Sequence, residues 1–364
     1  MKKIKLYNIF YKNYLKIPNN IFIQLGNKKY TYKKVKDIID KLQSITKSSK
    51  YLTLISQNSI LHIAFYLLAS KEKKIFVPLD INLEFETLLK QIKKFKLDNI
   101  FCGTLLFEKL NKKKFKVFNI NKLSRKFNKV FFNQKKSNLE NNFLLSFTSG
   151  STSDPKPIVF SEETKILRAK SNIDLYSLKE NDTIIISTPL HHTLAIRLMT
   201  MAIILKSKII VIDNYSFEKF MKYIKKYKVK FTFFISNQIS EILTNLKYIE
   251  YIKSLRAIVS SSSTLPNHLK EKLVKVYNGK VFEIYGLSEA SIVSNLNIKK
   301  DKKYLNSVGK KIKGVQIKIH KPKNSIGEIL IKSKFIFSGY LKKHGTVLKL
   351  TKEGYFKTGD IGQL

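Results

Sequence analysis

Short apolar segments alternate with amphipathic segments along most of the chain. The apolar segments are rich in β-branched and aromatic residues, which predicts strands at residues 51–56, 74–79, 99–102, 144–147, 183–187, 208–212, 230–235, 256–260 and 280–284. The segments between them repeat apolar residues at helical spacing, which predicts helices at residues 32–45, 59–71, 84–95, 162–176, 194–206, 217–227 and 267–277. Strands that alternate with helices indicate an α/β fold with parallel sheets and crossover helices.

The pattern changes near residue 301, where the expected helices stop. Three further strands at residues 315–320, 327–333 and 355–358 follow one another without helices between them, which predicts a small β subdomain. We therefore expect one large domain over residues 1–364. It would have two parallel-sheet α/β subdomains in residues 1–300 and a β-rich part in residues 301–364.

Targeting and membrane segments are not expected from this sequence. The apolar segments at residues 60–69 and 193–205 fall short of the roughly 20 residues that a transmembrane helix needs, and Arg197 interrupts the second one. The basic N-terminus has no following apolar region of the signal-peptide kind. A single cysteine excludes a disulfide framework and a cysteine-rich zinc site. We therefore expect a cytoplasmic protein.

The charge is strongly positive, because 69 Lys and Arg face 26 Asp and Glu, a net charge of +43. Such a surplus suggests a nucleic-acid or membrane partner. However, only four of the basic residues are arginine, the residue that nucleic-acid readers use for bidentate contacts: Arg125, Arg168, Arg197 and Arg256. Lysine is spread along the chain beside much Asn, Ile, Phe and Tyr, which share A/T-rich codons. Genome composition is the simpler explanation, so no specific nucleic-acid partner is expected. A cationic nucleic-acid-associated protein is an alternative that depends on charge alone.

The most unusual segment is residues 147–156, which read Phe-Thr-Ser-Gly-Ser-Thr-Ser-Asp-Pro-Lys between an expected strand and an expected helix. A turn rich in hydroxyl groups and backbone N–H groups, with a lysine, suits a polyphosphate. It is not a Walker loop, which needs a Gly-Lys pair followed by Ser or Thr. By composition alone, a polar surface loop is the preferred interpretation.

Three further segments change that interpretation. Residues 188–193 read Thr-Pro-Leu-His-His-Thr, residues 285–289 read Tyr-Gly-Leu-Ser-Glu, and residues 354–360 read Gly-Tyr-Phe-Lys-Thr-Gly-Asp. Each has an ordinary structural explanation when taken singly. In this order, and after residues 147–156, they resemble the motifs of the adenylate-forming family. This family includes acyl- and aryl-CoA synthetases, firefly luciferase and the adenylation domains of peptide synthetases. The resemblance extends from about residue 31 to the end of the chain.

The resemblance implies a large-domain fold that binds ATP and Mg²⁺, and it assigns a role to each matching residue. The loop that would wrap the β- and γ-phosphates contains Thr148, Ser149, Gly150, Ser151, Thr152, Ser153 and Lys156. Residues 260–265, with Ser262 and Ser263, would lie beside the adenine and the acyl channel. Tyr285 would stack on the adenine, with Gly286 and Ser288 next to it. Asp360 would accept hydrogen bonds from the ribose hydroxyls.

The chemistry implied by the family is ATP-dependent activation of a carboxylic acid as an acyl-adenylate. The candidate catalytic residues are His192 near the acyl carboxylate, Glu289 and Lys156, and the candidate magnesium ligands are Glu289 and Thr148. A carboxylate that attacks the α-phosphorus meets like charge, so the site needs cations and N–H donors. The acyl group would then pass to CoA or to a carrier-protein pantetheine. Amino-acid-activating relatives place an aspartate near His191-His192, and its absence favours an acyl or aryl acid.

The sequence also departs from the family pattern. Ser153 and Pro157 replace glycines in the phosphate loop, and Ser261 and Ser262 replace two more, which limits positive-φ conformations. Relatives continue into a hinge and a small C-terminal domain that carries a catalytic lysine, whereas this sequence ends at Leu364. We therefore expect the large domain alone. Either the chain is a fragment, or the small domain is a separate polypeptide and a partner of this chain; an acyl carrier protein is a further possible partner. The third alternative is a catalytically degenerate nucleotide-binding protein.

Overall fold

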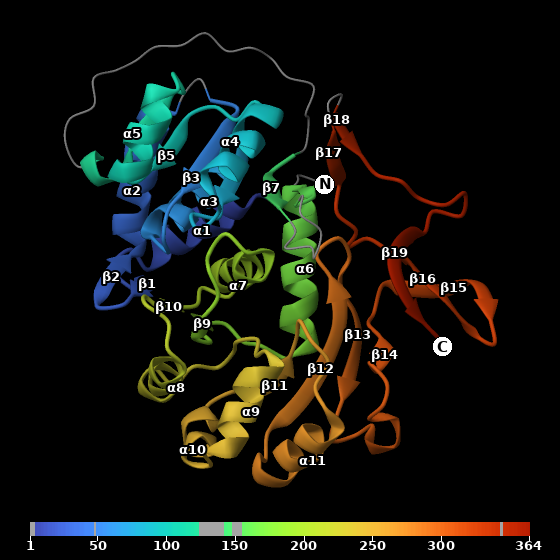
Figure 1. Ribbon diagram of the computed structural model, residues 1–364. Helices are drawn as coiled ribbons and strands as arrows, with labels where there is room; N and C mark the ends of the chain where they lie inside the picture. The colour runs from blue at the N-terminus through green and yellow to red at the C-terminus, as the bar shows by residue number, and fades with distance from the viewer. Residues whose placement is uncertain (1–3, 47–48, 124–141, 148–154, 343–344) are drawn as a thin grey trace. The chain divides into compact units, whose positions relative to one another are not determined.

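The computed structural model describes residues 4–46, 49–123, 142–147, 155–342 and 345–364 (Figure 1). The chain forms two compact units from interleaved segments. The first contains Met1–Ile166, Ile186–Asp213 and Ser338–Val347, and the second contains Leu167–Ile185, Asn214–Phe337 and Leu348–Leu364. The predicted boundary at residue 300 between an α/β part and a β-rich part stays a prediction.

The first unit is organised around an eight-stranded sheet with the order β18-β17-β8-β7-β4-β3-β5-β6. Strands β3, β4, β5, β6 and β7 are parallel to their neighbours, whereas β7–β8, β8–β17 and β17–β18 are antiparallel pairs. The strands are β3 Tyr51–Ile55, β4 Ile75–Leu79, β5 Ile100–Cys102, β6 Val117–Asn119, β7 Leu144–Phe147, β8 Pro157–Phe160, β17 Gly339–Lys342 and β18 Gly345–Val347.

A second sheet has the order β2-β1-β10-β9, in which β1 is parallel to β10 and antiparallel to β2. Its strands are β1 Ile21–Leu25, β2 Lys28–Thr31, β9 Ile184–Ile186 and β10 Ile209–Val211. The helices that begin and end within the first unit are α1 Leu6–Lys16, α2 Tyr32–Ile45, α3 Ile60–Glu72, α4 Phe85–Lys94, α5 Thr104–Lys112 and α7 Thr193–Ile204, with a short 3₁₀ turn η1 at Ile120–Lys122.

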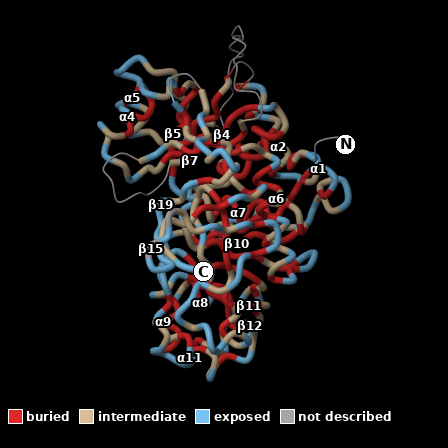
Figure 2. The backbone as a smooth tube through the Cα atoms, turned by 90° about the vertical axis from the view of Figure 1, so that its right-hand side faces the viewer, coloured by how far each residue is buried: buried red, intermediate tan, exposed pale blue. Residues whose placement is uncertain are grey.

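Burial explains why the central strands form where the sequence predicts them. Every residue of β3 and β4 is buried (β4 is labelled in Figure 2), and both segments are apolar except for Thr53, as expected of parallel strands covered on both faces. The bounds of α2 agree with the prediction because Thr31 caps the helix, accepting a hydrogen bond from the Lys34 amide at 3.1 Å.

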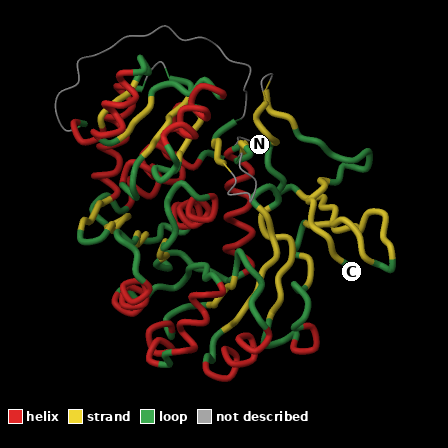
Figure 3. The backbone as a smooth tube through the Cα atoms, viewed as in Figure 1, coloured by secondary structure: helices red, strands yellow, loops and turns green. Residues whose placement is uncertain are grey.

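The second unit combines a mixed sheet with a group of strands that has no helices between them (Figure 3). In the sheet β11-β12-β13-β14, the pair β11–β12 is parallel and the other pairs are antiparallel. The second sheet has the order β15-β16-β19 and is antiparallel. The strands are β11 Ala257–Ser260, β12 Lys280–Leu287, β13 Ser291–Asn297, β14 Lys310–Lys311, β15 Val315–Lys323, β16 Ile326–Ser333 and β19 Phe356–Gly362.

The helices of the second unit are mostly those that the sequence predicts. They are α8 Phe217–Lys226, α9 Ser236–Thr244, α10 Lys247–Ile252, α11 Asn267–Val276 and the 3₁₀ turn η2 Lys302–Tyr304. Helix α6, Glu162–Leu175, begins in the first unit and continues into the second. Among the helices of the described segments, none is both long enough and apolar enough to cross a bilayer.

The predicted fold class is confirmed, and most predicted elements are present within a few residues. The strand predicted at residues 230–235 is wrong. That segment makes only isolated bridges, Ile184 with Phe231 and Phe234 with Ser260. Phe231, Phe233 and Phe234 are buried although no continuous ladder forms, so a short apolar run does not by itself specify a strand here. The sheets are also mixed rather than wholly parallel, because hairpins such as β12–β13 add antiparallel edges that periodicity does not distinguish.

Candidate active site

The first group of predicted site residues lies in the first unit, where α7 begins. His192 is the N-cap residue of α7, and its amide donates to the Pro189 carbonyl oxygen at 3.1 Å. The side chain of Asn58, which lies between β3 and α3, accepts a hydrogen bond from the Leu190 amide at 2.8 Å. The turn before α7 is therefore fixed by Asn58, and His192 is placed at the start of the helix.

The histidines of this group differ in exposure, because His62 is fully buried, His191 is half-buried and His192 is exposed. The ring centroids of His191 and His192 are 4.3 Å apart, and His191 Nε2 lies 3.6 Å from Asp80 Oδ2. Burial lowers the pKa of His191 and of His192 below the usual histidine value, and it lowers the pKa of the fully buried His62 to about 3. These rings are neutral at pH 7, so His192 can donate a hydrogen bond without carrying a charge.

The second group lies in the second unit and joins two predicted residues directly. Tyr285 on β12 donates from its hydroxyl to Asp360 Oδ2 on β19, at 2.6 Å. The Asp360 amide donates to Thr358 Oγ1 at 3.0 Å, and the Thr358 hydroxyl donates to the Ile329 carbonyl oxygen at 2.8 Å. Burial, followed by the bond to Asp360, raises the pKa of Tyr285, so this phenol stays protonated. A residue expected at adenine thus contacts the residue expected at ribose.

The β12–β13 hairpin carries the other predicted residues of this group. A Cβ atom on Gly286 would lie 2.2 Å from the Ser291 carbonyl oxygen, so no larger residue fits there. Ser291, which closes the turn at residues 288–290, has φ +70°. A positive φ at a residue other than glycine costs of order 1–3 kcal/mol and persists only where the surroundings enforce it. Ser288 and Glu289 therefore lie in a tight turn whose conformation is enforced by its surroundings.

The predicted adenine-side segment at residues 260–265 is held by a buried ion pair that the sequence did not indicate. Glu283 on β12 accepts a hydrogen bond from the Leu265 amide at 2.7 Å. Its other oxygen lies 2.6 Å from Lys270 Nζ, and both side chains are only 2% exposed. Ser262, at a family glycine position, has φ +75° and is exposed, as is Ser263. The serine therefore adopts a conformation that favours glycine.

The predicted phosphate loop lies mostly outside the described residues. Thr148, Ser149, Gly150, Ser151, Thr152 and Ser153 lie outside the described residues. Lys156 is exposed and directly precedes β8, whose first residue is Pro157, opposite Phe147 of β7. Proline is tolerated at the first residue of a strand. The replacement of a family glycine by Pro157 is therefore compatible with this sheet.

The described residues contain no cluster of three or more His, Cys, Asp or Glu that could hold a metal ion by themselves. Magnesium does not need such a cluster, because it is usually bound by one or two carboxylates together with substrate phosphates and water. Glu289 is half-buried and offers one carboxylate. A single carboxylate suits a magnesium ion whose other ligands are ATP phosphates and water.

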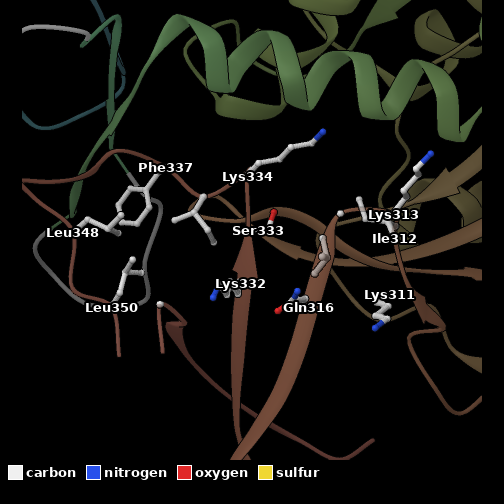
Figure 4. A pocket seen from close by; sticks show the side chains of 14 residues that line it. Lys311, Ile312, Lys313, Gln316, Lys332, Ser333, Lys334, Phe337, Leu348 and Leu350 are labelled. Carbon is white, nitrogen blue, oxygen red and sulfur yellow. The ribbon is translucent and has the colours of Figure 1, made fainter. Parts of the chain in front are cut away.

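Sequence reasoning did not select Arg168, Lys270 or Glu283, which are buried and surround the second group. One signal was available for Arg168, because an arginine in a chain that otherwise uses lysine indicates a need for its planar fork. A separate cavity of about 960 Å³ lies within the second unit, with a rim that includes Lys311, Lys313, Lys332 and Lys334 (Figure 4). It contains none of the predicted site residues.

Solved structures of acid–CoA ligases share this fold. The chain superposes on O-succinylbenzoate coenzyme A synthetase from Bacillus subtilis in complex with AMP with a TM-score of 0.85 and 17% identity, covering 98% of this chain and 95% of that one. A structure of the same enzyme with ATP and a magnesium ion gives a TM-score of 0.83 and 18% identity, covering 98% and 77%. The luciferase-like enzyme of Zophobas morio gives 0.80 and 21%, covering 99% and 93%. The fold is thus that of the large domain of adenylate-forming enzymes.

The sequence agrees with this class. The AMP-binding enzyme family matches residues 12–341, and the chain belongs to that family. It is 28% identical over 226 residues to the 2-succinylbenzoate–CoA ligase of Oceanobacillus iheyensis, covering 61% of this chain and 47% of the relative. It is 24% identical over 239 residues to the enzyme of that name from Enterococcus faecalis, covering 64% and 49%. The chain spans about half the length of these curated relatives.

Proposed function

We propose that this chain binds ATP with magnesium and takes part in activating an acyl or aryl carboxylic acid as an acyl-adenylate. The observation that carries this proposal is the contact of Tyr285 with Asp360. These two residues are 75 positions apart in the sequence, yet they meet where a nucleoside would need an aromatic face and a ribose acceptor side by side. Membership of the AMP-binding family supports the same assignment.

In the proposed reaction, a carboxylate oxygen of the acid attacks the α-phosphorus of ATP and forms a new phosphorus–oxygen bond. The bond between the α-phosphorus and the bridging oxygen breaks, and pyrophosphate leaves with its electron pair. Tyr285, with Gly286 and Ser288 beside it, would hold the adenine, Asp360 would accept from the ribose hydroxyls, and Ser262 and Ser263 would border the adenine and the acyl channel. Magnesium, when bound, would neutralise phosphate charge, with Glu289 and Thr148 as its ligands.

The phosphate end and the acid end of the site would be served by other residues. The loop at residues 148–153, with Lys156, would surround the β- and γ-phosphates through N–H and hydroxyl groups. His192 would orient the acid's carboxylate. A neutral imidazole suits this task, because it donates a hydrogen bond without trapping the anion in an ion pair. Partial desolvation of His192 lowers its pKa, which favours that neutral form.

For the acid, we propose an aromatic carboxylate, with 2-succinylbenzoate as the first candidate and CoA as the acceptor of the acyl group. The support is the name shared by the relatives from Oceanobacillus iheyensis and Enterococcus faecalis. A carrier-protein pantetheine is the other acceptor, and a separate small domain would be a further partner.

The nucleotide site is tested by calorimetry with AMP and with ATP and Mg²⁺. We expect Asp360→Ala to weaken AMP binding by about 1–3 kcal/mol, because the ribose hydroxyls lose a charge-assisted partner. The matched control is Glu353→Gln, which removes an exposed carboxylate that pairs with Lys318 in the same unit. AMP affinity that is equal in Asp360→Ala, in the control and in the unmodified chain would remove the assignment.

The reaction is tested separately by carboxylate-dependent exchange of pyrophosphate into ATP. The panel should contain 2-succinylbenzoate, benzoate and a fatty acid, each with and without CoA. Exchange that depends on an aromatic acid would support the proposed substrate class. ATP binding without exchange for any acid would favour a nucleotide-binding protein that does not activate acids.

A further inference from the structure

Arg168 on α6 is 1% exposed and donates hydrogen bonds to three backbone carbonyl groups of the second unit. Its Nη1 atom donates to the Ser288 carbonyl oxygen at 2.8 Å, and Nη2 donates to the Glu289 carbonyl oxygen at 2.6 Å. Both Nε, at 2.8 Å, and Nη2, at 2.5 Å, donate to the Phe335 carbonyl oxygen. One side chain thus joins the β12–β13 turn to the segment after β16.

The chemistry of this contact requires arginine. The guanidinium group presents five N–H donors in a fixed plane, so it can reach two consecutive carbonyl groups and a third one opposite them. A lysine ammonium donates from a single nitrogen and cannot span the same three positions. Moving a cation out of water is costly unless its donors are satisfied, and the hydrogen bonds to these three carbonyl groups satisfy donors of Arg168.

The turn that Arg168 contacts is held from a second direction as well. The Phe337 amide donates to the Glu289 carbonyl oxygen at 2.7 Å. The Glu289 carbonyl oxygen therefore accepts hydrogen bonds from a side chain of α6 and from an amide of the segment before β17. Hairpin turns are ordinarily solvated and variable, whereas this one is fixed on the side away from its own strands.

We propose that Arg168 is a positioning residue that preforms the Ser288–Glu289 turn, so that the Glu289 carboxylate is already oriented when ATP and magnesium bind. This inference rests on the proposed function, because it assumes that Glu289 meets the metal. Groups that orient a metal ligand typically affect metal affinity or activity by about 10–100-fold when they are changed. Arg168 would act in that way through the backbone of Glu289.

The first test compares Arg168→Lys with Arg256→Lys. Arg256 also belongs to the second unit and forms a two-point ion pair with Asp182, away from this turn. ATP affinity is measured by calorimetry with saturating Mg²⁺ and with EDTA, and AMP affinity is measured as well. We expect the Mg²⁺-dependent gain in ATP affinity to fall about tenfold in Arg168→Lys only. AMP affinity should stay within about twofold.

A purely structural role predicts a different result. Arg168→Lys would then lower the midpoint of thermal unfolding, as Arg256→Lys would, while the Mg²⁺-dependent gain stayed at the value of the unmodified chain. That outcome would overturn the inference. Failure of the unmodified chain to bind ATP or AMP at all would instead reject the proposed function.

The second test needs no variant and applies even if Arg168→Lys does not fold. Hydrogen exchange of the unmodified chain is followed for a peptide covering residues 287–291, with and without ATP and Mg²⁺. A preformed turn should exchange about as slowly as the adjoining strands before ligand is added, and should change by less than about twofold on binding. Rapid exchange that slows only when ATP and Mg²⁺ bind would show that the ligand orders the turn, and would overturn the inference.

Discussion

The histidine region of the first unit and the tyrosine–aspartate region of the second unit are stabilised in different ways. Around His192, burial lowers the pKa of His191, His192 and His62, and the rings are neutral. Around Tyr285, by contrast, a buried ion pair is present, and both Lys270 and Glu283 are almost fully excluded from solvent.

This difference predicts which changes in conditions or sequence destabilise each region. Neutral hydrogen bonds contribute little each, but they cost little to desolvate. A buried ion pair is expensive to break, because removing one partner leaves the other charge unpaired in a poor solvent. The first region should therefore respond to acid, and the second to loss of a single charged partner.

The largest effect should come from breaking the buried pair in the second unit. We expect Lys270→Met to destabilise the chain by about 3–5 kcal/mol, because Glu283 is left charged and unpaired. The matched control is Lys318→Met, which removes one partner of an exposed pair with Glu353 and should cost far less, because water screens an exposed ion pair. Urea denaturation measures both. Equal losses in the two variants would contradict the distinction between the regions.

An intermediate effect should appear on acidification of the first unit. His62 has an ordinary pKa near 6.5 when unfolded and one lowered to about 3 when folded. The unfolded chain therefore binds the extra proton first, and stability is lost as pH falls below 6.5. Between pH 7 and pH 5 this single group should cost about 2 kcal/mol.

The measurement is urea denaturation at pH 7 and pH 5 for the unmodified chain, for His62→Gln and for the control His268→Gln. His268 is an exposed histidine of the second unit. The acid-induced loss should shrink by about 2 kcal/mol in His62→Gln only. An unchanged loss in that variant would show that His62 does not make the first region acid-sensitive.

The smallest effect concerns backbone strain in the second region. Ser262 has φ +75°, a conformation that costs a residue with a side chain about 1–2 kcal/mol, whereas glycine loses roughly 0.5–1 kcal/mol of chain entropy. We expect Ser262→Gly to stabilise the chain by about 0.5–1 kcal/mol. Ser263→Gly, next to it and without a positive φ, should destabilise by a similar amount. Denaturant titration giving the same sign for both would contradict this account.

The elements that could be predicted are those whose formation depends on residues close together in the sequence. Helix α2 ends where the apolar period ends and begins at the Thr31 cap, so its bounds were predictable. Strands β3 and β4 are short segments, apolar except for Thr53, that polar residues bound on both sides. The ordered motifs, including His192, Tyr285 and Asp360, identified the family before any geometry was known.

Local pattern also misled where burial had another cause. Phe231, Phe233 and Phe234 are buried apolar residues, yet their segment forms only isolated β-bridges, to Ile184 and Ser260. Helix α1 was not predicted from the sequence, although Leu6, Tyr7 and Phe10 form an apolar face. Strand β13 was missed because its apolar and polar residues do not form a simple run.

Which side chains from distant parts of the sequence support the site depends on the tertiary structure. Arg168 reaches Ser288 across 120 positions, and Tyr285 reaches Asp360 across 75. Both contacts depend on the register of β12 with β13 and of β16 with β19, which no residue sets alone. The three described arginines, Arg168, Arg197 and Arg256, are buried or ion-paired. A side chain acquires such a role only when folding brings its partners within hydrogen-bond range, because these bonds act over a few ångströms and sequence separation places no limit on them.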